Sequence, residues 1–272
     1  SLFIRNQGCI SPIMKISKCD QSINITKSTF EDNSINQRCL PRALPAFQIT
    51  ISGCPDVVFE EIYALNSRDE KPGSLLYGLS VNISIINSVI ASSNQQRLSD
   101  YGLGNIVSGE YFRVSSSRFE NLGTISKPVF VVNDTKEIEI LDSRFVQCRS
   151  GDHSLMSFSD INDLKIGPRV DFIHNITLGN SSSILQIRDN KKVDIISCIF
   201  SLPADRPMPA IGLNNSEEVK IKDTHIESGD FSGFKILRSG RRVTVRRIKR
   251  PPTWLFEGDI SDLNPDNLRV SD

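Results

Sequence analysis

Residues 138–145 read Ile138-Glu139-Ile140-Leu141-Asp142-Ser143-Arg144-Phe145, and this stretch decides the fold. Ile138 and Ile140 flank a charged residue, so apolar and polar side chains alternate with the period of two that is typical of a β-strand. A small residue, Ser143, follows three positions after Ile140, and Phe145 comes two positions later. The stretch therefore predicts a strand, a short polar corner and the start of a second strand.

The same pattern recurs along the chain at intervals of about 26 residues. Weaker copies start at Val57, Leu164 and Val243. The clear copies begin at Ile23, Ile83, Phe112, Ile138, Val193 and Val219. Another short apolar run, such as Val129–Val131, precedes most copies and is separated from them by a polar turn. Each repeat thus supplies three short strands and leaves no room for a helix of convincing length.

Short strands repeated at this period predict an all-β solenoid, the single-stranded parallel β-helix, with about nine coils of ~26 residues and three short strands per coil. The Leu/Asn consensus of leucine-rich repeats is missing, and a propeller blade would need four strands.

The residue between the two apolar positions of each copy is expected to face solvent and to stack on its equivalent in the next coil. In five successive copies its charge alternates in sign, and these residues are Arg113, Glu139, Lys165, Asp194 and Lys220. Opposite charges on neighbouring strands stabilise a sheet, whereas like charges repel. The alternation therefore supports the register of the alignment, against the alternative of coincidental surface charges.

Two stacks of side chains are expected inside the solenoid. The small residues Ser88, Ser117 and Ser143 should meet at one corner. The phenylalanines should form a column, and its members are Phe119, Phe145, Phe172 and Phe200. Phe172 is displaced by one residue, which predicts a bulge near Pro168.

The repeat defines a β-helix over residues 1–250 and an irregular capping or docking tail over residues 251–272 that begins at Pro251-Pro252. Ser1-Leu2-Phe3 matches the end of a repeat, so we expect the chain to start inside a coil, with further solenoid coils or other protein subunits at this end. Basic residues gather before the tail, and these are Arg238, Arg241, Arg242, Arg246, Arg247, Lys249 and Arg250. They form either a solvated end that discourages edge pairing or a docking patch for an acidic partner.

The six cysteines are too few for a disulfide scaffold, but four of them occupy equivalent positions in adjacent coils. This spacing predicts the disulfides Cys9–Cys39 and Cys19–Cys54, and leaves Cys148 and Cys198 free. The alternative is that all six are small buried residues.

Sequons for N-glycosylation occur six times, at Asn24, Asn82, Asn133, Asn175, Asn180 and Asn214. The repeat places all but Asn175 and Asn180 at outward or turn positions. Glycans are therefore possible partners, and sequons and disulfides together favour the secretory pathway and an extracellular or cell-surface location.

Global composition excludes some partners. The 32 basic and 32 acidic residues give a formal net charge of zero, which argues against nucleic-acid binding by bulk electrostatics. No stretch approaches 18 consecutive apolar residues, so no membrane insertion is expected.

The coil pattern resembles the pectate-lyase-like superfamily of right-handed parallel β-helices over nearly the whole chain up to residue 250. Phe30-Glu31-Asp32-Asn33 and Phe119-Glu120-Asn121-Leu122 are also similar to the Phe-x-x-Asn repeats of polymorphic outer-membrane-protein-like surface proteins. The first resemblance implies a right-handed solenoid. Enzymes of that superfamily act on acidic polysaccharides through clustered carboxylates, with calcium and an arginine base in the lyases and paired aspartates in the hydrolases.

Neither cluster can be carried over to this chain. The alternating charges of the central strands cannot assemble the carboxylates that a calcium site needs. His153, His174 and His225 fall in different coils and show no metal spacing. We therefore assign no catalytic residue, no metal site and no cofactor.

Two functions remain. The first is a non-enzymatic structural or adhesive protein, a rigid segment of an extracellular surface or filament assembly. The second is a polysaccharide-binding or polysaccharide-cleaving β-helix, lyase or hydrolase, whose loops 33–46, 66–75 and 91–104 form a cleft. All four tyrosines fall near these loops and are possible carbohydrate contacts: Tyr63, Tyr77, Tyr101 and Tyr111.

Overall fold

A computed structural model describes most of the chain. The described residues are 1–4, 7–8, 13–35, 47–66, 74–93, 103–125, 127–151, 153–179, 182–203, 208–227, 234–237, 242–246 and 268–271. Strands are the regular secondary structure of these residues, and none of them forms a helix. The all-β prediction is confirmed.

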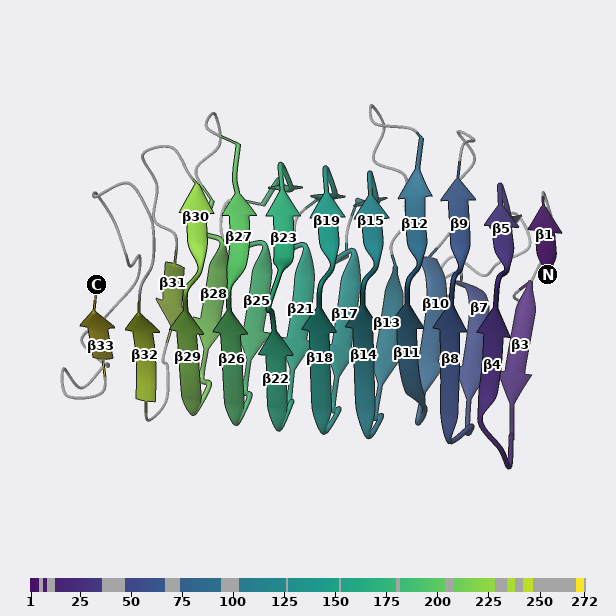
Figure 1. Ribbon diagram of the computed structural model, residues 1–272, viewed down its shortest axis with the longest axis horizontal. Helices are drawn as coiled ribbons and strands as arrows, with labels where there is room; N and C mark the ends of the chain where they lie inside the picture. The colour runs from purple at the N-terminus through teal and green to yellow at the C-terminus, as the bar shows by residue number, and fades with distance from the viewer. Residues whose placement is uncertain are drawn as a thin grey trace.

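Three long sheets run along the molecule, and every strand pairing in them is parallel. Figure 1 shows their strands stacked side by side along the long axis. Sheet 1 contains β3 (Met14–Ser17), β7 (Phe47–Ser52), β10 (Ser74–Leu79), β13 (Gly104–Val107), β17 (Phe130–Asn133), β21 (Met156–Ser159), β25 (Leu185–Arg188), β28 (Ile211–Asn214) and β31 (Phe234–Leu237). Sheet 2 contains β4 (Ile23–Thr26), β8 (Asp56–Glu60), β11 (Asn82–Ile86), β14 (Tyr111–Ser115), β18 (Glu137–Leu141), β22 (Asp163–Ile166), β26 (Lys192–Ile196), β29 (Glu218–Lys222), β32 (Arg242–Arg246) and β33 (Leu268–Ser271).

Sheet 3 contains β1 (Leu2–Ile4), β5 (Thr29–Glu31), β9 (Tyr63–Asn66), β12 (Val89–Ser92), β15 (Arg118–Glu120), β19 (Arg144–Val146), β23 (Val170–Ile173), β27 (Cys198–Ser201) and β30 (His225–Glu227). Two short pairings complete the described strands: β2 (Gln7–Gly8) with β6 (Ser34–Ile35), and β16 (Gly123–Thr124) with β20 (Arg149–Ser150) and β24 (Ile176–Thr177). Each coil crosses sheets 1, 2 and 3 in turn, so the predicted solenoid with three main strands per coil is confirmed.

Left-handed backbone at the corners explains why the chain is rich in Asn, Asp and Ser. The residue that follows each sheet 1 strand from β3 to β28 has a positive φ, for example 51° at Asp134, 55° at Asp189 and 51° at Asn215. Asn and Asp tolerate this conformation better than other L-residues because their side chains hydrogen-bond locally. In several coils the next residue is a buried small or polar residue, as Thr135, Asn190 and Ser216 are, whereas Val81 and Ile161 are apolar. Turn chemistry is thus built into every repeat.

The two interior stacks are confirmed. Ring centroids of Phe119 and Phe145 lie 4.6 Å apart, those of Phe145 and Phe172 5.2 Å, and those of Phe172 and Phe200 4.7 Å, with nearly parallel planes. At the corner before sheet 3, the backbone N–H of Ser88 donates to Ser117 Oγ at 3.1 Å, and that of Ser117 donates to Ser143 Oγ at 3.2 Å.

The displacement of Phe172 is absorbed at a corner. The strands on both sides keep their register, since Ile140 pairs with Ile166 and Phe145 with Phe172. The extra residue therefore lies between β22 and β23, in the turn that contains Gly167 and Pro168. Gly167 has a φ of 107°, and a Cβ there would lie 1.7 Å from the Ile196 carbonyl oxygen, so this turn requires glycine.

The prediction of an irregular tail over residues 251–272 is wrong for its last residues. Residues 268–271 form β33, which pairs in parallel with β32 and extends sheet 2. An alternating segment can add to the exposed edge of β32 without the rest of the repeat motif, because edge pairing needs only backbone groups. Residues 251–267 lie outside the described part of the chain.

Candidate functional site

The outward face of sheet 2 carries the predicted ladder of charges. Arg113 faces Glu139, Glu139 faces Lys165, Lys165 faces Asp194, and Asp194 faces Lys220 in the strand register. Arg113 Nε lies 3.9 Å from Glu139 Oε2, and Lys192 Nζ lies 3.4 Å from Asp194 Oδ2. Along this central row each charge faces an opposite charge in the next coil, whereas in a neighbouring row Glu137 faces Asp163.

A hydrogen-bonded cluster at the beginning of sheet 2 is the most elaborate polar constellation among the described residues. Asp56, at the first position of β8, accepts hydrogen bonds from Ser22 Oγ at 2.9 Å, Asn82 Nδ2 at 3.0 Å and Tyr111 OH at 2.8 Å. Asn82 Oδ1 accepts from the backbone N–H of Glu110 and of Tyr111. The cluster therefore connects four successive coils.

The contacts of this cluster favour an ionised Asp56 and a neutral Tyr111. Hydrogen bonds from Asn82 and Tyr111 lower the pKa of Asp56 below its ordinary value of 3.8. Burial, followed by the hydrogen bond to Asp56, raises the pKa of the Tyr111 hydroxyl above 10.0. Asp56 is then a carboxylate and Tyr111 a neutral donor at pH 7, and the Arg113 guanidinium lies 4.7 Å from the centre of the Tyr111 ring.

Such an arrangement serves as a clamp between coils. The Asp56 carboxylate accepts three side-chain hydrogen bonds, and its lowered pKa makes it a weaker base than an ordinary aspartate. The three residues Asp56, Asn82 and Tyr111 each stand immediately before the first apolar residue of a repeat copy. Aligning that position, which our sequence analysis did not do, would have brought them together.

The three described tyrosines do not form a common platform. Tyr63 lies on sheet 3, where 43 % of its surface is exposed, Tyr77 lies on sheet 1 and Tyr111 on sheet 2. The three described tyrosines thus belong to three different faces of the solenoid. Tyr101 and most of the loops 33–46, 66–75 and 91–104 lie outside the described residues.

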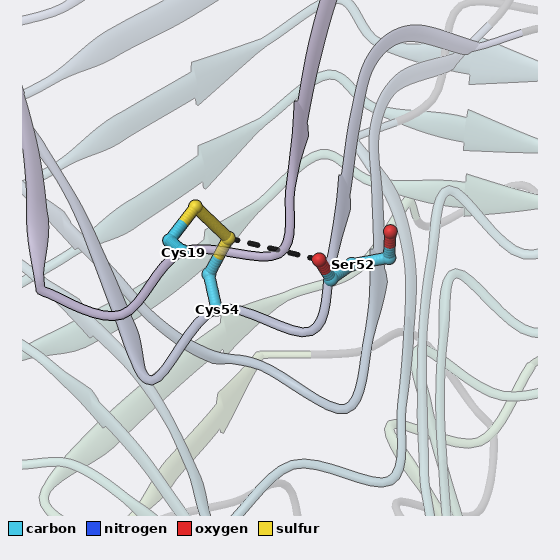
Figure 2. Close-up of a disulfide and its surroundings, with 3 residues drawn as sticks. All are labelled: Cys19, Ser52 and Cys54. Atoms are coloured by element: carbon cyan, nitrogen blue, oxygen red, sulfur yellow. Dashed lines mark hydrogen bonds between the residues drawn. A yellow bond between two sulfur atoms is a disulfide. The ribbon is translucent and has the colours of Figure 1, made fainter.

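The predicted disulfide Cys19–Cys54 is present, with a Cα–Cα distance of 4.5 Å. Figure 2 shows the bond next to Ser52, whose carbonyl oxygen lies 3.6 Å from Cys54 Sγ. Both cysteines follow a corner residue with positive φ, so the bond joins equivalent corners of neighbouring coils. The predicted pair Cys9–Cys39 lies outside the described residues.

Cys148 and Cys198 are free, as predicted, and both are buried. Burial raises the pKa of each thiol to about 12. Both are therefore neutral at pH 7, and neither has the accessible thiolate that a nucleophilic cysteine needs.

The glycosylation candidates occupy very different environments. Asn24 is exposed on β4, and Asn133 and Asn214 are half-buried at the ends of β17 and β28. Asn82 is the half-buried member of the Asp56 cluster described above. Asn180 lies outside the described residues.

Asn175 is a correction to our prediction. It is fully buried, its Oδ1 accepts a hydrogen bond from the Cys148 N–H at 2.8 Å, and its Nδ2 donates to the Phe145 carbonyl at 2.8 Å. A glycan has no room there, so Asn175 is not a glycosylation site of this fold.

Two of the remaining sequons also have a structural explanation. In Asn133-Asp134-Thr135 and Asn214-Asn215-Ser216, the middle residue has a positive φ and the third points inward. The corner itself therefore favours an Asn or Asp followed by a small hydroxyl residue, which makes sequons common without selection for glycans. The predictions for Asn24, Asn82, Asn133 and Asn214 remain predictions.

Two other kinds of feature are absent from the described residues. They contain no group of three or more His, Cys, Asp or Glu side chains placed to hold a metal ion. They also contain no helix whose length and apolarity would suit it to crossing a membrane.

Comparison with known proteins gives no match. No protein-family model matches this chain, and neither a curated protein nor a solved structure is similar enough to be counted as a match.

Proposed function

We propose that this chain is a non-enzymatic structural or adhesive β-helix, a rigid segment of an extracellular surface or filament assembly. The observation that carries the proposal is the charge ladder of sheet 2. Its outward charges face opposite charges of the same chain from Arg113 to Lys220. Charged side chains that face opposite charges in this way help to hold neighbouring coils together. They present no concentrated charge of one sign to a substrate.

Rigidity is the property that the described residues support best. The phenylalanine column, the serine corner and the Asp56 clamp each connect consecutive coils. A solenoid built from such contacts between neighbours resists bending along its length, because each coil is fixed to the next by its core and by its surface.

A wider relationship and a location form part of the same proposal. The parallel solenoid is compatible with the pectate-lyase-like right-handed β-helices, whose coils have a similar length and three strands. The Cys19–Cys54 disulfide is compatible with an oxidising, extracellular location. Glycans at exposed sequons such as Asn24 are consistent with that location as well.

The alternative function is carbohydrate binding or cleavage by the loops 33–46, 66–75 and 91–104. The two functions are separated by incubating the purified chain with acidic and neutral polysaccharides and measuring new reducing ends and unsaturated products. We expect neither product above the level of a heat-denatured control. Turnover of any of these polysaccharides would contradict the structural role.

Location and assembly need a second experiment. Immunogold labelling of the native source is expected to place the protein outside the cell or on its surface, within ordered structures. A purely cytosolic signal would contradict the extracellular assembly.

A further inference from the structure

The outward face of sheet 1 carries almost no charge between β7 and β28. Two rows of side chains point outward on it between β7 and β28, because residues two apart on a strand share a face. The first row is Thr50, Tyr77, Asn105, Val131, Ser157, Gln186 and Gly212, and the second is Ser52, Leu79, Val107, Asn133, Ser159, Arg188 and Asn214. Arg188 is the one charged residue in these two rows.

The other two sheets are different in the same coils. Outward positions of sheet 2 include the five charges of the ladder and further carboxylates such as Glu137 and Asp163. Sheet 3 presents Arg118, Glu120 and Arg144. Charged residues make up 24 % of the chain, so their near absence between β7 and β28 distinguishes this part of sheet 1 from the rest of the surface. Lys15 on β3 and Lys235 on β31 continue the first row at its two ends.

The middle of the charge-poor face is apolar. Leu79 and Val107 are neighbours in the second row, and Val131 follows Asn105 and Tyr77 in the first. Leu79 is 39 % exposed. Hydroxyl and amide side chains surround this centre. An apolar centre with a polar, uncharged rim is the composition of protein–protein contact surfaces, whose cores are depleted in charge.

Two polar contacts hold side chains of the face in place before any partner binds, whereas the buried Oδ1 of Asn105 has no hydrogen-bond partner among the described residues. Ser159 Oγ donates a hydrogen bond to Asn133 Oδ1 at 2.6 Å, and Gln186 Nε2 lies 3.5 Å from the Gly212 carbonyl oxygen. Side chains that are already ordered lose little conformational entropy in a complex. Lateral contact with this face is therefore less costly than contact with mobile lysines and glutamates.

We propose that the outward face of sheet 1, centred on β10, β13 and β17, is a lateral contact surface for a second copy of this chain. This inference rests on the proposed assembly role, because it names a surface and a partner for that assembly. In a face-to-face pair each neutral row meets a neutral row, so the contact buries almost no charge and brings no like charges together. Sheets 2 and 3 could not meet their own copies without desolvating many ion-paired groups.

A second copy fits this face better than a carbohydrate does. Sugar-binding faces depend on aromatic platforms, and Tyr77 is the one aromatic residue in the two rows. The flat face has a footprint of roughly 450 Å² per partner, if seven strands lie 4.8 Å apart and each contributes about four residues. Specific, stable interfaces bury about 800 Å² per partner. A single lateral contact is therefore weak, and repeated contacts along an assembly would add to it.

The test is self-association of the full chain, measured by sedimentation equilibrium over a wide range of protein concentration. We expect a reversible, concentration-dependent increase in mass above that of the 30.4 kDa monomer. Val131→Lys places a charge in the centre of the face and is expected to weaken self-association at least tenfold. Ser157→Lys, at a polar outward position in the same row, is expected to weaken it as well.

The matched control is Val146→Lys. Val146 is also half-buried and outward-facing, but it lies on β19 in sheet 3. This variant is expected to associate like the original chain, and circular dichroism of all variants checks that each one folds. Finding only monomers at every concentration, or self-association that Val131→Lys and Ser157→Lys leave unchanged, would overturn the inference. A glycan on Asn133 that covers the face would also overturn it.

Two results separate this inference from the proposed function. A purely monomeric chain that turns over no polysaccharide contradicts the lateral surface and leaves a structural role through the ends of the solenoid intact. Binding of a soluble neutral polysaccharide that is abolished by Val131→Lys would assign the face to carbohydrate and contradict the second copy.

Discussion

Arg113 and Glu139 face each other on the adjacent parallel strands β14 and β18, with Arg113 Nε 3.9 Å from Glu139 Oε2. Both side chains are partly exposed, so the pair alone contributes little to stability. Its significance is the position of Glu139 between two cations, since Lys165 faces it from the other side. The pair is thus the first step of a ladder in which every member has opposite charges as neighbours.

Reversing one charge of this ladder should destabilise the fold. In Glu139→Lys, three cations would stand next to one another at positions 113, 139 and 165. We expect a loss of about 1 kcal/mol in the free energy of unfolding, because two favourable cross-strand pairs become repulsive. Urea denaturation at low salt measures the loss. Glu139→Gln is the control and should lose less, and the difference between the variants should shrink in 1 M NaCl. A difference that does not depend on salt would rule out an electrostatic origin.

The Asp56 clamp should make the N-terminal coils sensitive to acid. The pKa of Asp56 is lowered in the folded state, so its contribution is fully present above the ordinary pKa of 3.8. This contribution is lost as the pH falls through the lower folded value. We expect urea midpoints to decrease in that range, and Asp56→Asn to decrease less steeply with pH.

Tyr111 provides a direct check of the same clamp. In Tyr111→Phe, Asp56 loses one of the hydrogen bonds that lower its pKa, and this pKa should rise toward 3.8. A titration of the Asp56 carboxyl carbon by NMR measures the shift. If the pKa of Asp56 is the same with and without the Tyr111 hydroxyl, the hydrogen bond at 2.8 Å does not stabilise the carboxylate.

Loss of the Cys19–Cys54 disulfide should loosen the first coils. The bond closes a loop with a sequence separation of 35 residues. Chain entropy predicts a stabilisation of about 3–4 kcal/mol for a loop of this size. In a solenoid this stabilisation is local, because each coil contacts only its neighbours. After reduction, hydrogen exchange should accelerate in β3, β4 and β7 and remain unchanged in β21 and β25.

A variant separates the disulfide from other effects of the reductant. The double substitution Cys19→Ser with Cys54→Ser should show the fast exchange without reductant and should not respond to it. Cys148 and Cys198 should stay unmodified by iodoacetamide in the folded chain, because both are buried. Acceleration spread over all coils would contradict the local character of the bond.

The sequence predicted the solenoid because its information is local and repeated. Alternation with a period of two identifies strands, and equivalent residues in successive copies must stack, so Phe145 on Phe172 and Arg113 on Glu139 follow from the alignment. The strand β33 was not predicted, because its sequence lacks the repeat motif and its formation depends on pairing with the edge of β32.

The neutral face of sheet 1 was missed for a different reason. The strands of sheet 1 vary more in sequence than those of sheet 2, and several follow long insertions, so their outward rows become visible only when the register is known. Burial of a polar residue is equally hard to foresee. Asn175 resembles a turn residue, and only the corner geometry shows that its amide points inward.

Asn175 provides the sharpest test of the corner geometry. Its carboxamide bonds the Cys148 N–H and the Phe145 carbonyl of the preceding coil, both at 2.8 Å. Asn175→Ala would leave the buried Cys148 N–H without this partner, which costs about 1–3 kcal/mol, whereas the Phe145 carbonyl stays within the ladder of β19 and β23. We therefore expect a decrease of about 1–3 kcal/mol in the free energy of unfolding, measured by urea denaturation. Asn133→Ala, at a half-buried sequon, is the control and should cost less than 1 kcal/mol.

Expression in a glycosylating eukaryotic host completes this test. Glycopeptide mass spectrometry should find residue 175 unmodified in the folded, secreted chain, because its Nδ2 is bonded inside the solenoid. A glycan on Asn175, or equal stability of Asn175→Ala and the original chain, would show that this side chain faces outward. Such a result would remove the bond to Cys148 and change the register of the corner after β23.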